Sequence, residues 1–320
     1  MKVFASHNPN DETRKNSSAG GVFTTLAELV LRKGGVIYGV TFDDNWNIVH
    51  QREEKEDNIH RFRGSKYAYS HIGDSLRNVV SDLNDGRIVL FSGTPCQIAA
   101  IRKKIGDNKN LITVEVVCHG APKHEYWEKY LTAICQKFDK TRDDISKISF
   151  RDKRTGWAGY SFTIDFKDGT LFSERGSKNL YMKAFLSDYT LKDGCFKCPF
   201  KYPDGSKADI TLGDLWGIKK LAPEIYNDSG STLVIARTAI GEQYTELLSN
   251  DCELTLDAVA HYNPAIIRHA SAPKNRGRFL EEFKSGCDVL SIFDKFTKPT
   301  LRNRLKLKFF AAIRYLKTTR

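Results

Sequence analysis

Seven cysteines are the residues of this 320-residue chain whose types and spacing point most directly to chemistry. Cys195 and Cys198 form a C-x-x-C pair in the segment DGCFKCPF, and Cys96 and Cys118 stand alone in SGTPCQ and VVCHG. The odd count, the ordinary domain size and a start without the apolar core of an export signal argue against a disulfide framework. Grouped cysteines in a reducing compartment more often bind a metal or carry out redox chemistry. We interpret the other three cysteines as structural or incidental.

Four thiolates arranged as two single cysteines and one C-x-x-C pair fit a Cys₄ site for zinc or for a [4Fe–4S] cluster. The spacing alone does not decide between the two. Zinc sites of the ribbon type use two C-x-x-C pairs, whereas this chain has one, so the sequence favours iron and sulfur and leaves zinc as the alternative. The candidate ligands are Cys96, Cys118, Cys195 and Cys198. For Cys96 and Cys118 taken alone, two buried core thiols are an equally good interpretation.

The elements around Cys96 and Cys118 explain how two distant thiols could meet. Residues 87–91 and 111–117 are typical of buried strands, and a helix between them begins at Thr94. Cys96 then lies in the first helical turn, where unpaired amides favour a thiolate. In a right-handed βαβ unit both cysteines lie at the carboxyl ends of neighbouring parallel strands, where open α/β sheets bind their ligands.

The remaining pattern predicts an α/β fold, a partly parallel sheet flanked by helices, with an inserted or appended α+β part. The expected strands cover 36–42, 46–50, 87–91, 111–117, 148–151, 161–166, 170–172, 208–214 and 231–237, and the expected helices cover 22–33, 72–83, 95–104, 179–189 and 241–249. We divide the chain into an α/β flavin-binding part at 1–140, an α+β part with the C-x-x-C loop at 141–300, and a basic tail at 301–320.

Three further segments are candidate site elements. Small residues at 17–21 (SSAGG) precede a helix, where backbone amides can approach a phosphate, although helices also begin with serine and glycine for capping alone. At 63–67 (RGSKY) a cation beside a hydroxyl and an aromatic ring suits a phosphate-bearing ring cofactor, as it suits an ordinary surface loop. At 208–217 (ADITLGDLWG) a strand ends beside Trp216, which is typical of a site edge or of a turn with a buried tryptophan.

Eight motifs stand in a fixed order between about residues 17 and 245. They are SSAGGVF, RGSKYAYS, SGTPCQIAAI, VVCHGAP, FRDKRTGW, CFKCPFK, ADITLGDLWGI and GSTLVIARTAIG. In this order they resemble the coenzyme F-420 hydrogenase/dehydrogenase beta-subunit family. The resemblance implies an α/β body that binds FAD with a [4Fe–4S] cluster beside the flavin. The family includes subunits that reduce or oxidise a deazaflavin coenzyme, and bacterial members found with polysaccharide-assembly genes.

The resemblance also implies roles for individual residues, although it assigns no catalytic one. The cluster ligands would be the same four cysteines. The flavin nucleotide would be contacted by Ser18, Gly20, Gly21, Ser65, Lys66 and Tyr67, and Thr94 and Gln97 would flank the first ligand and face the flavin. A flavin converts a two-electron hydride step into single electrons, which a cluster passes on one at a time.

This sequence departs from the fuller family pattern at its start. Many bacterial members begin with a ferredoxin-like module of closely spaced cysteines, whereas no cysteine precedes Cys96 here. We therefore expect an iron–sulfur flavoprotein oxidoreductase that exchanges electrons between a hydride donor or acceptor, deazaflavin-like or other, and a separate partner protein or a small-molecule substrate. Polysaccharide assembly is a candidate pathway. The alternative is a zinc-stabilised α/β binding or accessory protein without redox activity.

The net charge of +11 first suggests nucleic acid or an anionic surface as a partner. The last twenty residues carry seven of these charges and no acidic residue, which leaves +4 for the other 300. Their apolar residues recur at helical spacing, so 301–320 predicts a basic amphipathic helix for an anionic membrane surface or for a protein partner. The body has no basic run interleaved with aromatic residues, so we expect no nucleic-acid partner.

The apolar residues of the sequence indicate a protein with a core of its own and no membrane span. No stretch approaches the eighteen consecutive apolar residues of a transmembrane span. Apolar residues make up 40% of the chain, enough for a sizeable core. We expect a cytoplasmic protein, free or peripheral on the inner face of the membrane through 301–320.

Overall fold

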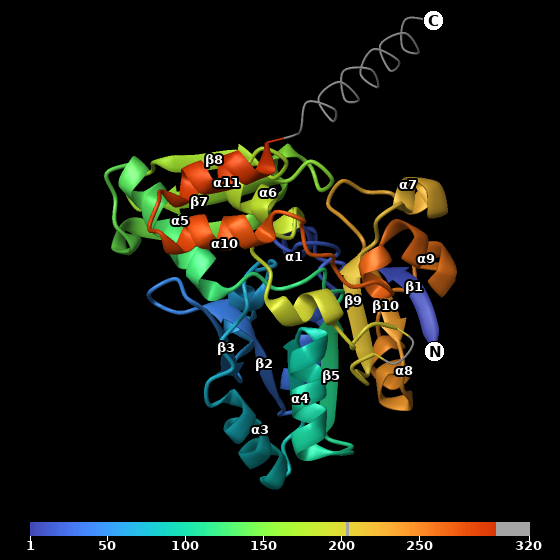
Figure 1. Cartoon of the computed structure of the whole chain (residues 1–320). Helices are drawn as coiled ribbons and strands as arrows, with labels where there is room; N and C mark the ends of the chain where they lie inside the picture. The colour runs from blue at the N-terminus through green and yellow to red at the C-terminus, as the bar shows by residue number, and fades with distance from the viewer. Residues whose placement is uncertain (203–204, 299–320) are drawn as a thin grey trace, which may run out of the picture.

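Two sheets organise the chain in this computed structural model, which describes residues 1–202 and 205–298. The larger sheet has the strand order β11 (Cys252–Glu253), β1 (Lys2–Ser6), β10 (Thr232–Ala236), β9 (Ile210–Asp214), β5 (Leu111–Val116), β4 (Val89–Gly93), β2 (Val36–Phe42) and β3 (Ile48–Glu53). The central strands β9, β5, β4 and β2 are parallel, whereas β3, β10, β1 and β11 pair antiparallel with their neighbours. The predicted partly parallel α/β sheet is confirmed (Figure 1).

Helices cover both faces of the larger sheet because its central strands are apolar on both sides. α2 (Val22–Arg32) packs on one face, where Leu26 is buried in the same cluster as Leu90 of β4. α3 (Ser75–Asn84) and α4 (Pro95–Ile105) pack on the other, where Ile98 is buried with Phe91. Each of these helices leads into a parallel strand, so its first turn lies at the carboxyl edge of the sheet.

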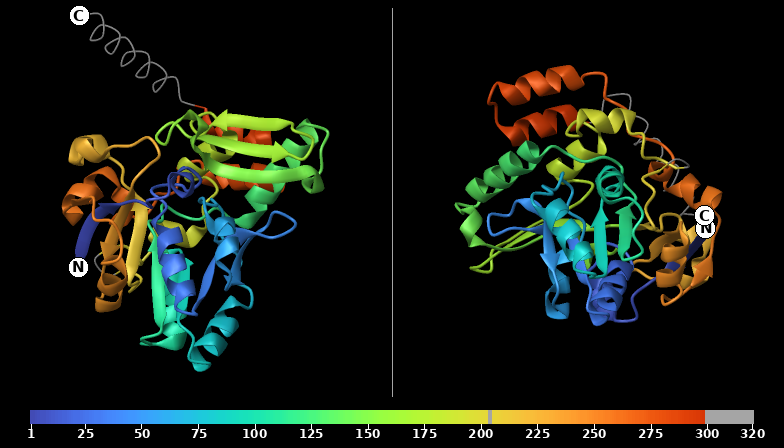
Figure 2. Two further views of the ribbon diagram at one scale, coloured as in Figure 1. Left: turned by 180° about the vertical axis from the view of Figure 1, so that it is seen from behind. Right: turned by 90° about the horizontal axis from the view of Figure 1, so that it is seen from below.

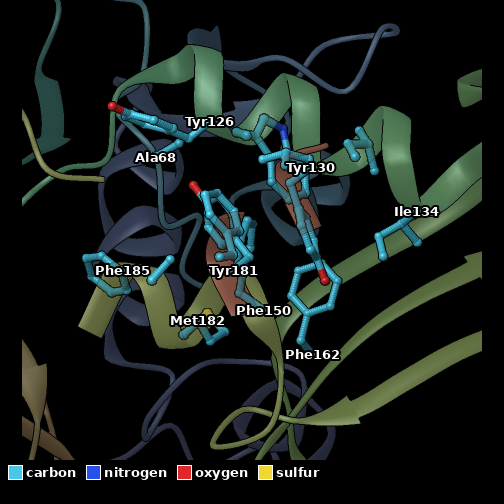
Figure 3. Packing of buried hydrophobic residues seen from close by; sticks show 14 of the residues in the cluster. Ala68, Tyr126, Tyr130, Ile134, Phe150, Phe162, Tyr181, Met182 and Phe185 are labelled. Atoms are coloured by element: carbon cyan, nitrogen blue, oxygen red, sulfur yellow. The ribbon is translucent and has the colours of Figure 1, made fainter. Parts of the chain in front are cut away.

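The smaller sheet is antiparallel, with the order β6 (Ile145–Asp152), β7 (Ser161–Phe166) and β8 (Leu171–Arg175). An aromatic core joins it to α5 (His124–Lys137), α6 (Leu180–Leu186), α10 (Arg276–Lys284) and α11 (Val289–Thr297). In that core Phe150 lies 4.9 Å from Trp127 and 5.2 Å from Phe162 between ring centroids, and Figure 3 shows Phe150 close to Tyr181. Figures 1 and 2 show this second body beyond one end of the larger sheet.

The chain leaves the larger sheet after β5, builds the smaller sheet and returns at β9. The division at residue 140 stays a prediction, and strands on both sides of it share the larger sheet. The remaining helices are α1 (Asp11–Lys15), α7 (Ile218–Leu221), α8 (Ala239–Thr245) and α9 (Leu256–Tyr262). Within the two described ranges no helix has the length and apolarity to cross a membrane. The tail predicted at 301–320 lies outside those ranges.

Candidate functional site

A cavity of about 530 Å³ opens at the carboxyl edge of β4 and β5, within the size range of small-molecule sites. Two apolar side chains of its wall, Val116 and Leu186, are 42% and 52% exposed, so the cavity offers apolar surface to a ligand. The sequence-predicted residues that line it are Ser18, Gly21, Ser65, Lys66, Tyr67, Thr94, Gln97 and Cys118. Those that do not line it are Gly20, Cys96, Cys195 and Cys198.

A second, larger cleft of about 1210 Å³ adjoins this cavity, and residues 63–66 and Arg151 line both. Basic side chains outnumber acidic ones along its wall. Lys15, Arg61 and Lys147 are among them. A cleft with this excess of positive charge attracts small anions.

The segments 17–21 and 63–67 meet through one pair of serines. The Ser65 amide donates to Oγ of Ser18 at 2.6 Å, and the two hydroxyl oxygens lie 2.8 Å apart. Gly21 begins α2 with a positive φ of 87°, the left-handed conformation that a glycine adopts without strain. The two predicted cofactor loops therefore form one continuous wall of the cavity.

Gly20 has a different place from its neighbours. Its amide donates to Oγ1 of Thr232 at 2.8 Å, and its carbonyl accepts from the Asn8 amide at 2.7 Å. A Cβ at this position would lie 2.6 Å from the carbonyl oxygen of Ser6. Gly20 thus allows the segment to pack against β1 and β10.

Lys66 and Tyr67 use their polar atoms within the wall. The Lys66 ammonium donates to the carbonyls of Arg61 at 3.1 Å and Arg63 at 3.0 Å, and burial lowers the pKa of Lys66 to about 7. The Tyr67 hydroxyl accepts from the Arg151 guanidinium at 3.2 Å, and its ring stacks on Phe185 at 5.0 Å. The Lys66 ammonium therefore stabilises the conformation of the loop that carries it.

The predicted N-cap at Thr94, with the helix beginning at Pro95, is confirmed. Thr94 and Gln97 form a capping box, and Oγ1 of Thr94 lies 3.2 Å from Sγ of Cys96. β4 and β5 pair in parallel with Gly93 opposite Glu115, so the segments that carry Cys96 and Cys118 leave the same edge of the sheet. The topological prediction for these two segments is therefore confirmed.

Behind Cys96 lies a buried polar network that sequence reasoning missed. The Gln97 amide donates to Oγ of Ser70 at 2.9 Å, and His50 lies 3.1 Å from the same oxygen and 3.0 Å from the Ser92 carbonyl. Burial lowers the pKa of His50 to about 4, so the ring is neutral at physiological pH. His50 comes from β3 and belongs to no motif, so no local signal could have marked it.

The loop after β5 runs beside the segment that leads into the C-x-x-C pair. Lys123 donates from its amide to the Thr190 carbonyl at 3.0 Å, and Lys192 does so to that of Ala121 at 3.0 Å. The Ala121 amide in turn points at Sγ of Cys195 at 3.4 Å. These contacts bring the loop that follows Cys118 against the first cysteine of the pair.

All seven cysteines are free thiols. Burial raises the pKa of Cys118 to about 12, against the opposing charge of Lys201. Negative charge on any of the other three predicted ligands raises this pKa further, as expected for thiols that share one region. In the part of the chain that the structure describes, no group of three or more His, Cys, Asp or Glu side chains is arranged to hold a metal ion. The four thiols therefore lie in one region without forming such a group.

The motifs FRDKRTGW and ADITLGDLWG meet at one buried ion pair. Arg151 donates to both carboxylate oxygens of Asp214, at 2.9 and 3.2 Å. Trp157 also donates to Asp214 at 3.2 Å and stacks on Trp216 with centroids 5.4 Å apart. Asp214 and Trp216 line the cavity, as expected of a site edge.

The fold and the cavity define an α/β protein with a cavity at the carboxyl edge of its parallel strands, where such folds bind their ligands. Residues 3–77 match the family model for the coenzyme F420 hydrogenase/dehydrogenase beta subunit N-terminus, and residues 86–261 match the model for its C terminus. The chain belongs to this family, as its motifs predicted. The family is one of oxidoreductases, which assigns the chain to electron transfer.

A solved structure supports the fold. The protein is similar to a chain of the F420-reducing [NiFe] hydrogenase complex from Methanosarcina barkeri, with a TM-score of 0.56 and 17% sequence identity. The similarity covers 90% of this chain and 94% of that one. A comparison with curated proteins found no match.

Proposed function

We propose that the protein is a flavin- and [4Fe–4S]-dependent oxidoreductase that passes electrons between a hydride donor or acceptor and a partner protein or small substrate. One observation carries the proposal. At one edge of the sheet, segments 17–21 and 63–67 both line the cavity, and Cys118, which also lines it, interacts with the other three predicted cluster ligands. The family membership supports the redox class.

The cavity suits FAD in its chemistry. Apolar side chains such as Val116, Met182 and Phe185 line it and would pack on a flavin ring. The Thr24 amide donates to the Gly21 carbonyl at 3.1 Å, whereas the Val22 and Phe23 amides in the first turn of α2 have no partner among the described residues, so these two could donate to a phosphate beside Ser18 and Ser65. A bound flavin would supply the exchange between hydride and single-electron transfer.

The donor set suits a cluster. Cys96 lies exposed in the first turn of α4, with its Sγ 3.2 Å from Oγ1 of Thr94. Lys201 donates to the Cys118 carbonyl at 2.5 Å and to that of Ala265 at 2.7 Å, which fixes the backbone of a second ligand. Because burial keeps the Cys118 thiol protonated, cluster assembly must displace its proton.

We further propose a separate electron-transfer partner protein, since the solved chain with this fold comes from a multisubunit hydrogenase complex. The basic cleft beside the cavity is the route that we propose for a small anionic substrate. Seven free thiols fit a reducing cytoplasm. A role in polysaccharide assembly and a membrane contact through 301–320 stay predictions.

The test is an anaerobic purification with quantification of flavin and metal, followed by Cys198→Ser. We expect flavin absorbance, a broad cluster absorbance and about four irons per chain. Cys198→Ser should lose the iron and keep its fold. The matched control is Cys287→Ser, because Cys287 is exposed and lies outside the predicted ligands. A colourless protein with one zinc per chain would contradict the proposal. Global unfolding of Cys198→Ser, with Cys287→Ser still folded, would also contradict it, because that result indicates structural zinc.

A further inference from the structure

The motif FRDKRTGW contains a lysine whose charge is used in an unusual way. Lys153 opens the short helical turn η3 (Lys153–Thr155) after β6. Its ammonium donates to three main-chain carbonyls, those of Arg14 at 2.7 Å, Ala19 at 2.7 Å and Ser229 at 2.5 Å. Holding a lysine side chain in one place costs rotamer entropy, which three charge-assisted hydrogen bonds can offset.

The three carbonyls belong to three separate stretches of chain. Arg14 is in α1, Ala19 is in the cavity wall, and Ser229 lies in the turn before β10. The Arg14 guanidinium adds a fourth link, because its Nε donates to the Gly230 carbonyl at 2.7 Å. Lys153 therefore joins the smaller sheet to the segment that leads into α2.

The wall segment is held from two sides. On one side the Gly20 amide donates to Thr232, and on the other the Ala19 carbonyl accepts from Lys153. Between them Ser18 reaches the second loop through its contact with Ser65. A shift of the Ala19 carbonyl would therefore move both loops that face the cavity.

We propose that Lys153 is a positioning residue for the anionic part of the cofactor: it holds segment 17–21 so that the first-turn amides of α2 face the cavity. This inference rests on the proposed flavin function. The ammonium also neutralises carbonyl oxygens that would otherwise repel a phosphate, so it favours the anion by charge as well as by geometry. Lys153 is not part of the wall of this cavity, although it does line the adjoining basic cleft.

The charged groups around Lys153 make its effect dependent on pH. Burial lowers the pKa of Lys153 to about 7; Asp214 and Asp228 oppose this shift, and Arg151 and Arg14 reinforce it. The ammonium is present below this pKa and is lost as the pH rises through it. The affinity for the cofactor should therefore fall as the pH rises from about 6 to about 8.5.

The experiment is a titration of the flavin-free protein with FAD at several pH values in this range. The quenching of flavin fluorescence measures the binding. We expect Lys153→Met to raise the dissociation constant at the low-pH end at least about tenfold and to make its pH dependence less steep, with the remainder due to Lys66, whose pKa burial also lowers to about 7. Lys137→Met is the matched control, because Lys137 is exposed at the end of α5, and it should bind as the unaltered protein does.

The possible failures are distinguishable. If the unaltered protein does not bind FAD, the proposed function is wrong. If it binds FAD and Lys153→Met binds equally well with the same pH profile, the inference about Lys153 is wrong. Should Lys153→Met not fold, Lys153→Arg decides, because arginine keeps its charge throughout. A pH profile in Lys153→Arg that is less steep than that of the unaltered protein supports the inference, and an equally steep profile overturns it.

Discussion

Gly20→Ala tests whether this glycine serves packing or cofactor contact. The added methyl group would lie 2.6 Å from the Ser6 carbonyl oxygen, 2.8 Å from the Thr232 amide nitrogen and 2.9 Å from its Oγ1. Ser6 and Thr232 are paired residues of β1 and β10, so the first two contacts are with backbone that is already fixed by the sheet. The methyl group has to push these strands away or displace segment 17–21.

The size of the effect follows from three contributions. Overpacking a filled site costs about 1–3 kcal/mol, and loss of the Gly20–Thr232 hydrogen bond costs about 1 kcal/mol more. Gly20 has no left-handed φ, so alanine adds no backbone strain and restricts the unfolded chain, which offsets about 0.4–1 kcal/mol. We expect the free energy of unfolding to fall by about 2 kcal/mol.

Equilibrium unfolding in urea measures this change, with Gly277→Ala as the control. Gly277 lies in α10, and a Cβ there would meet nothing within 4 Å, so alanine should stabilise that helix by up to about 1 kcal/mol. The same chemical change is thus expected to act with opposite signs at the two positions. Unchanged stability of Gly20→Ala combined with weaker FAD binding would refute the packing argument and return Gly20 to the cofactor wall.

Two further predictions concern buried charge. In the unfolded chain His50 takes up a proton below its ordinary pKa of about 6.5, whereas in the folded protein it does so only below about pH 4. The free energy of unfolding should therefore fall by about 3 kcal/mol as the pH is lowered from about 6.5 to about 4. Urea titrations at several pH values should show a smaller fall for His50→Gln. Asp214→Asn leaves the Arg151 guanidinium buried without its carboxylate and should lower the free energy of unfolding by about 3 kcal/mol or more. The control Asp74→Asn breaks an exposed ion pair and should lower it by about 0.5 kcal/mol. Equal losses of stability in thermal unfolding would contradict this account of the buried pair.

Local signals predicted the elements that carry the site. The N-cap at Thr94 and the strand, helix and strand around it need only neighbours in sequence, and the handedness of the βαβ unit then places Cys96 and Cys118 at one edge. The sequence did not predict β1, because a strand of five residues with no turn signal beside it has too weak a pattern of apolar residues. Its place depends on pairing with β10, more than two hundred residues away.

The supporting contacts could not be predicted in the same way. Lys153 meets carbonyls from positions 14, 19 and 229, and nothing in its own segment indicates that its charge faces inward. His50 is likewise tied to Ser70 and Ser92 only through the folded sheet. Such groups are found only when the tertiary structure places them against their partners.

The cofactor motifs contain two physical kinds of residue. Lys66 and Gln97 direct their polar groups at the main chain or at Ser70, and Gly20 makes room for β1 and β10, so all three shape the loops. Ser18 and Ser65 keep polar atoms at the cavity wall. Substitutions of the first kind must therefore lower stability and cofactor affinity together, because the same contacts fold the loop and aim its amides. Ser18 and Ser65 also bind each other across the two loops, so substitutions of the second kind should lower the affinity for the cofactor more than they lower the free energy of unfolding.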